Sequence, residues 1–176
     1  LSGFHQVANS QLSLFCIEYL NELGFKIKKK DIVDGLKKVK WEGRLEIVEE
    51  NPSVILDVAH NPFAFDVLFR ELKRFYPEKK INLLIGVLSD KDYRKIVKIS
   101  SGNCSFAACV KPAIKKGLEP YILRDLFMEE GVPSECFDSV VAGYDYLKSI
   151  SEREDVILIS GSHYIVGEFK RNYKIS

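Results

Sequence analysis

The chain has 176 residues, which fits one domain or one domain with an appendage. Hydrophobic residues make up 46% of it, enough for a sizeable core and too many for a disordered or fibrous protein. The net charge of +1 argues against a nucleic-acid-binding protein that depends on a strong positive field. No apolar run approaches the roughly 20 residues that cross a membrane, and the first residues are already polar, so we expect neither a membrane segment nor a signal peptide.

The four cysteines contain no C-x-x-C pair, and each has apolar neighbours in the sequence. We interpret Cys16, Cys104, Cys109 and Cys136 as small buried side chains in a reducing cytoplasm, rather than as disulfides or metal ligands. The chain has no initial methionine and opens directly in a polar motif, so we expect it to be part of a longer protein.

The first 40 residues are expected to be helical. Residues 6–23 place their larger apolar side chains on one face and are followed by Gly24, which predicts a helix that ends there. Asp31 is expected to cap a second, shorter helix over residues 32–39. Because no strand is predicted in this part, we expect residues 1–40 to form a helical linker or to belong partly to a missing neighbouring domain, and residues 41–176 to form a separate domain.

Strands and helices alternate through the rest of the chain. A turn over residues 41–44 precedes an alternating strand at 45–50, which is expected at an edge or antiparallel because its alternation implies one exposed face. Asn51-Pro52 then turns the chain into an apolar strand that starts at Ser53 and is followed by a helix from Phe63 to Tyr76. The later predictions are strands at 81–87, 105–110 and 156–160, helices at 92–100, 119–130, 139–151 and 163–173, and a short strand or turn around Cys136.

This alternation predicts an α/β fold made of right-handed βαβ units. The sheet is expected to be mostly parallel, with helices on both of its faces. In such a fold the carboxyl ends of the strands meet at one edge, where ligands bind.

Four predicted loops leave the sheet at that edge, and all four carry polar residues. They hold Asp57-x-x-His60-Asn61, Ser89-Asp90-Lys91-Asp92, Lys111-Pro112 and Gly161-Ser162-His163-Tyr164. Each also has a structural interpretation: a hydrogen-bonded histidine, a satisfied carboxylate, a helix cap or a turn. The sequence contains no Walker loop, dinucleotide fingerprint, zinc motif or nucleophile elbow. The residues alone therefore predict an α/β module that contributes half of a site for a nucleotide or an acidic ligand.

Five short motifs, taken in order, resemble a known family. They are Gly3-x-His5-Gln6-x-x-Asn9, Trp41-x-Gly43-Arg44, Asp57-x-Ala59-His60-Asn61-Pro62, Asp90-Lys91-Asp92 and Gly161-Ser162-x-Tyr164. Together they resemble the C-terminal half of folylpolyglutamate synthase/dihydrofolate synthase, in the Mur ligase superfamily, over nearly the whole chain. Two positions depart from the family pattern: Val58 stands where the family usually has Gly, and Glu42 where it usually has Pro. Val58 is expected to narrow the approach of a ligand to the backbone.

The resemblance implies a Rossmann-like three-layer sandwich that closes over a nucleotide as part of an ATP-dependent amide ligase. In this family ATP phosphorylates a carboxylate of dihydropteroate or a folate, and the amino group of L-glutamate attacks the acyl phosphate. The phosphate loop and the magnesium (Mg2+) ligands are expected in an N-terminal ATPase domain that this chain lacks. The chain alone is therefore expected to be inactive.

The resemblance also assigns roles to single residues. Asn9 is similar to the family's adenine contact, and Arg44 to the cation that reaches the ATP phosphates, a role that suits the planar guanidinium. Asp57 and His60 correspond to the pair near the ribose and the incoming glutamate, which makes Arg44 and His60 the candidate catalytic residues. Ser162 is a candidate for binding a glutamate carboxylate, and so, as a weaker candidate, is Lys91, whose alternative is a surface lysine.

Two alternatives stay open. The domain could come from another Mur-type ligase that acts on peptidoglycan precursors or cyanophycin, although His5-Gln6 and the Asp90-Lys91-Asp92 loop favour the folate enzymes. It could also be a non-catalytic α/β binding module. Whether the parent enzyme adds the first glutamate, extends the chain or does both is not readable from these residues.

Overall fold

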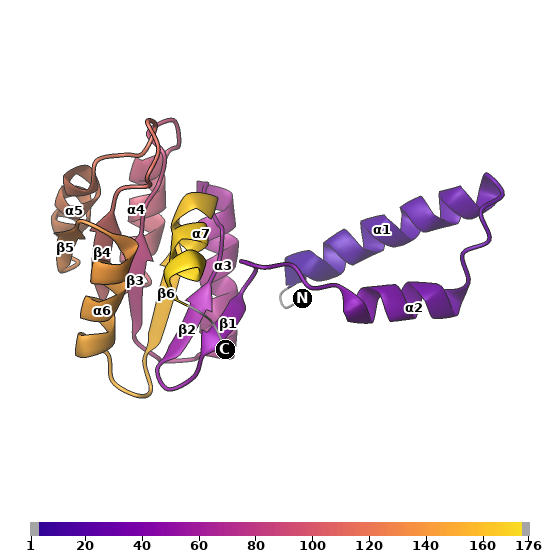
Figure 1. Ribbon diagram of the computed structural model, residues 1–176, viewed down its shortest axis with the longest axis horizontal. Helices are drawn as coiled ribbons and strands as arrows, with labels where there is room; N and C mark the ends of the chain where they lie inside the picture. Colours follow the sequence, from indigo (N-terminus) through magenta and orange to yellow (C-terminus); the bar gives the residue numbers. More distant parts are fainter. Residues whose placement is uncertain (1–3, 174–176) are drawn as a thin grey trace.

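A six-stranded sheet forms the centre of the larger body in the computed structural model, which describes residues 4–173 (Figure 1). Gly3 of the first motif lies outside the described residues. The strands are β1 (Glu46–Glu49), β2 (Ser53–Leu56), β3 (Ile81–Ile85), β4 (Phe106–Val110), β5 (Ser134–Phe137) and β6 (Val156–Ser160). The helices are α1 (Phe4–Glu22), α2 (Lys29–Lys38), α3 (Pro62–Phe75), α4 (Tyr93–Ser101), α5 (Pro120–Glu129), α6 (Val140–Ile150) and α7 (His163–Asn172).

The strands lie in the order β1-β2-β6-β3-β4-β5. All neighbouring pairs are parallel except β1 with β2, so residues 46–49 form the antiparallel edge strand that the alternation predicted. Strand β6 lies between β2 and β3, with Ile159 opposite both Leu56 and Leu84. The carboxyl ends of these three strands are therefore level, and the loops that follow them meet at one edge of the sheet.

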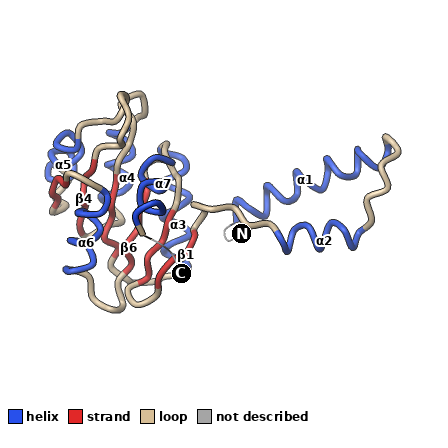
Figure 2. Tube along the Cα trace, viewed as in Figure 1, coloured by secondary structure: helices blue, strands red, loops and turns tan. Residues whose placement is uncertain are grey.

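Helices cover both faces of the sheet, which confirms the mostly parallel α/β sandwich. Because side chains alternate along a strand, Ile55 packs in a core with α3, α4 and α5, whereas Val54 and Leu56 pack in a second core with α6 and α7. Figure 2 shows the same strands between the two sets of helices.

Side-chain oxygens fix the starts of the helices at this edge. Asn61 accepts a hydrogen bond from the Ala64 amide and Ser162 one from the Ile165 amide, so these two residues are the N-caps of α3 and α7. Pro62 occupies the first turn of α3, as predicted, where no amide donor is needed. The start of α4 is fixed in the same way by Asp92.

Helices α1 and α2 project from the β1–β2 side of the larger body (Figure 1). Gly24, with a φ of +97°, ends the turn after α1, as predicted. No residue from Gln6 to Glu42 is buried. The apolar face of α1 is exposed, including Phe15 at 67% and Tyr19 at 61%. In residues 4–173, no helix is both long and apolar enough to span a membrane.

Two local predictions were wrong. Helix α2 begins at Lys29, and Asp31 lies inside its first turn, where its carboxylate accepts a hydrogen bond from the Lys28 amide at 3.1 Å. Cys16 and Cys136 are exposed, because the first is on the projecting helix and the second is on the edge strand β5.

Burial raises the pKa of the Cys104 thiol to about 12 and also that of Cys109, so neither is a reactive thiolate near neutral pH. Cys109 is buried, as interpreted from the sequence, whereas Cys104 is half-buried and packs against the same core.

Candidate functional site

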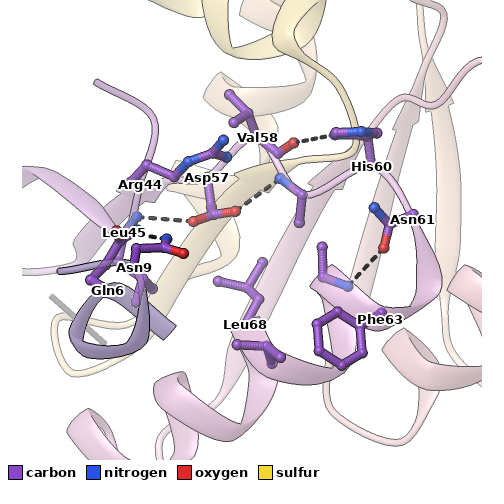
Figure 3. Close-up of a pocket in the computed structure, with 13 residues that line it drawn as sticks. Gln6, Asn9, Arg44, Leu45, Asp57, Val58, His60, Asn61, Phe63 and Leu68 are labelled. Carbon is purple, nitrogen blue, oxygen red and sulfur yellow. Dashed lines mark hydrogen bonds between the residues drawn. The ribbon is translucent and has the colours of Figure 1, made fainter. Parts of the chain in front are cut away.

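A cavity of about 260 Å³ opens where β2 ends, in front of the turn that precedes β1 (Figure 3). Its walls come from four segments: the start of α1, the turn at residues 44–45, the end of β2 and the first turns of α3. Four predicted site residues, Asn9, Arg44, Asp57 and His60, line this one cavity, together with Gln6 and Phe63.

Asp57 ties the Arg44 turn to the end of β2. Its side chain is 7% exposed, and its two oxygens accept hydrogen bonds from the Leu45 amide at 3.0 Å and the Ala59 amide at 2.8 Å. The Val58 amide donates to the Gly43 carbonyl at 2.9 Å, which adds a second link between the same segments. These contacts hold Arg44 at the cavity edge, and the Asp57 carboxylate thus has a structural role as acceptor of two backbone amides.

Gly43 and Val58 are in close contact beneath that turn. Gly43 has a φ of +67°, and a Cβ placed on it would lie 2.8 Å from Cγ1 of Val58. Val58 is 4% exposed and packs in the core with α6 and α7. Its side chain therefore fills space under Gly43 instead of projecting towards the ligand cavity, although Val58 is part of the cavity lining.

Lys170 of α7 braces the same turn from the other side. Its Nζ lies 2.7 Å from Glu46 and 2.9 Å from Glu42, and Glu46 in turn accepts a hydrogen bond from the Gly43 amide at 2.7 Å. Burial alone would lower the pKa of Lys170, but the hydrogen bonds to Glu46 and Glu42 outweigh it and raise that pKa. Glu42, where the family usually has Pro, thus contributes an ion pair to the turn.

Arg44 is half-buried at the cavity edge. Within residues 4–173, no hydrogen bond or salt bridge of its guanidinium is found. A planar guanidinium without a carboxylate partner, facing a cavity, is suited to bind a carboxylate or phosphate through two parallel hydrogen bonds.

His60 is held in one orientation by its own backbone. Its Nδ1 lies 2.9 Å from the Val58 carbonyl, so that nitrogen carries a hydrogen and Nε2 is the one left for a ligand. The ring of His163, the first residue of α7, lies 5.7 Å from the His60 ring between centroids. His163 was not predicted as a site residue, although it stands in the loop after β6 that the sequence marks as polar.

The other predicted residues occupy different places. Asn9, on α1, lies 3.4 Å from the Gln6 side chain through its amide nitrogen. Ser162 is 3% exposed and lies outside the cavity lining. Its hydroxyl oxygen accepts a hydrogen bond from the Ile165 amide and so caps α7. Lys91 also lies outside the lining, 3.7 Å from Asp90.

The described residues contain no cluster of three or more His, Cys, Asp and Glu side chains able to hold a metal ion. The donors that line the cavity are a guanidinium, an imidazole and side-chain amides. Such a set fits an anionic or hydrogen-bonding ligand such as part of a nucleotide.

Known proteins share the sequence pattern and the fold of this chain. The family model described as "Mur ligase, glutamate ligase domain" matches residues 43–163. The dihydrofolate synthase/folylpolyglutamate synthase of Bacillus subtilis (strain 168) is 29% identical over 178 residues, which cover 99% of this chain and 40% of that protein.

Two solved structures are also similar. The Escherichia coli FolC in complex with DHPP and ADP superposes with a TM-score of 0.80 at 27% identity, over 89% of this chain and 37% of that one. A bifunctional folylpolyglutamate synthase/dihydrofolate synthase with Mn, AMPPNP and L-glutamate bound has a TM-score of 0.79 at 26% identity, over the same shares. The chain thus spans less than half the length of each of these relatives.

The matched segment contains all six strands and runs from the turn before Arg44 to His163. It covers well over half of the chain, and the fold and the aligned strand ends agree with it. The chain therefore belongs to the Mur ligase family, as its glutamate ligase domain.

Proposed function

We propose that this chain is the C-terminal domain of an ATP-dependent carboxylate–amine ligase that adds L-glutamate to dihydropteroate or a folate. The observation that carries the proposal is the shared cavity: Asn9, Arg44, Asp57 and His60, brought from three parts of the chain, line one hollow at the carboxyl end of β2. The ADP, AMPPNP, DHPP and L-glutamate named for the related structures are ligands of the proposed reaction, which supports it.

The chain supplies only half of the proposed site. A cavity of about 260 Å³ is below the range of roughly 300–1,000 Å³ typical of complete ligand pockets. It would hold a portion of a nucleotide, with the remainder contacted by a second domain. We propose that an N-terminal ATPase domain of the same protein supplies the phosphate loop and the Mg2+ ligands, and that residues 1–40 link the two domains. A cytoplasmic location is part of this proposal.

In the proposed reaction a substrate carboxylate is activated as an acyl phosphate, which the amino group of L-glutamate attacks. Arg44 stabilises negative charge on the phosphate oxygens, because this half-buried residue has a planar guanidinium group and lines the cavity. His60, fixed through Nδ1, offers Nε2 to the ribose or the incoming glutamate. Asn9 contacts the adenine from α1. Asp57 holds the turn that carries Arg44 in place by accepting a hydrogen bond from the Leu45 amide.

Two further assignments concern the glutamate. Ser162 keeps a hydroxyl proton to donate to a carboxylate, since its oxygen is the acceptor in the α7 cap. Lys91 would have to leave Asp90, at 3.7 Å, to reach the same ligand. Both residues follow strands adjacent to β2 or β6 in the sheet, but neither lines the cavity.

The test is Arg44→Ala in the full-length gene product. Loss of one charged donor to a transition state costs about 100- to 1,000-fold in turnover, and we expect a fall of that order with circular dichroism and thermal unfolding unchanged. Arg70→Ala is the matched control, because Arg70 is exposed on α3 and forms a salt bridge with Asp66 at 3.0 Å, away from the cavity lining. Equal turnover of wild type and Arg44→Ala would remove the phosphate role.

Substrate assays separate the alternatives. The full-length protein should form an amide from L-glutamate with dihydropteroate or tetrahydrofolate, and not with UDP-linked peptidoglycan precursors. Residues 1–176 alone should show no ligase activity and only weak nucleotide binding, because the proposed site is incomplete. Activity only with the UDP-linked substrates would move the protein to another branch of the family, and none with any of them would favour a binding module.

A further inference from the structure

His163 lies beside His60, which lines the cavity together with Arg44, although His163 is not itself part of the lining. The rings of His60 and His163 lie 5.7 Å apart between centroids, inclined by 47°. They follow neighbouring parallel strands, His60 after β2 and His163 after β6, so the sheet fixes their separation. The charge of Arg44 is close enough to act on the His163 ring. His163 itself is exposed and accessible to a ligand.

This gathering of positive groups is electrostatically unfavourable without an anion. Although His163 is exposed as a residue, partial desolvation of its ring lowers its pKa below the ordinary value, and the positive charges of His60 and Arg44 lower that pKa further. Asp57 acts in the opposite direction but does not cancel them. The two Asp57 oxygens also accept the Leu45 and Ala59 amides, so this carboxylate is committed to the backbone. An anion at the rim of the cavity would interact favourably with all three basic groups.

We propose that His163, together with His60 and Arg44, binds an anionic group of the ligand at this rim. The identity of the ligand rests on the proposed function: the anion is either a phosphate of the nucleotide or a carboxylate of L-glutamate. Both are oxyanions that accept hydrogen bonds from an imidazolium and a guanidinium. His163 adds a third basic side chain to Arg44 and His60, the two candidate catalytic residues predicted from the sequence.

Binding should be linked to protonation. Desolvation and the neighbouring positive charges lower the pKa of His163, whereas a bound anion favours its protonated form, so binding of the anion takes up a proton. Affinity for the anion should therefore rise as the pH falls from about 8 to about 6, by roughly tenfold or less per linked proton and pH unit.

The experiment uses the full-length gene product and two readouts, each at about pH 8 and pH 6. One is the Kd of ADP by calorimetry, and the other is the KM for L-glutamate. At pH 6, His163→Gln should raise either the Kd of ADP or the KM for L-glutamate by about threefold to tenfold, with little effect at pH 8. His163→Arg should restore that affinity and remove this part of its pH dependence. The ligand's own ionisation cancels when variants are compared at the same pH.

Arg171→Gln is the control, since it removes a positive charge from the exposed, opposite end of α7 and should behave like wild type. A change confined to the ADP arm identifies the phosphate, and one confined to the glutamate arm identifies the carboxylate. The proposal is overturned if the wild type is active and His163→Gln has the same Kd for ADP and the same KM for L-glutamate as the wild type at both pH values. A wild-type protein without ligase activity would instead refute the proposed function, and the ADP arm would still test His163.

Discussion

The contact between Gly43 and Val58 predicts a specific coupling between two substitutions. Alanine at position 43 would place a Cβ 2.8 Å from Cγ1 of Val58, which is inside van der Waals contact. Val58 cannot easily move, because its branched side chain is 4% exposed in a packed core. In Val58→Ala the offending methyl is gone, and the next atom of that side chain, Cβ, lies 3.9 Å away.

The expected magnitudes follow from these distances. Gly43→Ala forces a φ of +67° on an L-residue, at about 1–2 kcal/mol, and adds overpacking of about 1–3 kcal/mol. Val58→Ala removes two buried methyl groups, a loss of about 2 kcal/mol. The double variant keeps the backbone strain and the cavity but loses the overlap. It should therefore be more stable than the sum of the single effects by about 1–3 kcal/mol.

The assay is urea unfolding of wild type, both single variants and the double variant, followed by circular dichroism. The coupling free energy is taken from the four unfolding free energies. Additivity within about 0.5 kcal/mol would refute the reasoning, because it would mean that the Val58 side chain does not occupy the space beneath Gly43. Arg44 lies on the same turn, so turnover of the full-length variants should fall with Gly43→Ala and partly return in the double variant.

Two further outcomes are expected. Lys170→Met removes the ion pairs that brace the Arg44 turn, and we expect a severalfold lower turnover with a loss of less than about 1 kcal/mol in the free energy of unfolding. Lys170→Arg should restore turnover. An unchanged turnover in Lys170→Met would contradict the bracing role. Burial raises the pKa of Glu49, but the hydrogen bonds from Lys148 and Tyr144 outweigh it, so the pKa is lowered overall. The stabilisation by Glu49 should be present above its ordinary pKa near 4.5 and disappear as the pH falls through the lower folded value. The difference in urea midpoint between wild type and Lys148→Met should therefore shrink between about pH 5 and pH 3, and a constant difference would contradict the assignment.

The elements themselves were readable from local pattern. The strand 156–160 and the helix from His163 follow from a short apolar run and a helical repeat, and their observed bounds agree within about one residue. The antiparallel edge position of residues 46–49 followed from their alternation. These features depend on neighbours within a few residues, which is where sequence pattern carries its information.

The features that were missed depend on contacts between distant segments. The His60–His163 pair joins residues more than 100 positions apart, and it exists only because β6 lies beside β2. The packing of Val58 beneath Gly43 likewise depends on how the turn folds over the end of β2. Cys16 has apolar neighbours in the sequence, but no residue from Gln6 to Glu42 is buried, so the hydrophobicity of the neighbouring residues did not predict its exposure.

The position of β6 has a consequence for biosynthesis. This strand is made after the other five, yet it lies between β2 and β3, so the first five strands are two separate groups until residues 156–160 have left the ribosome. A nascent chain that has not reached this point exposes unpaired strand edges in the middle of its future sheet, where another chain could pair. Completion of folding is thereby postponed to the end of translation of this domain, and the contact between His60 and His163 forms in the same last step.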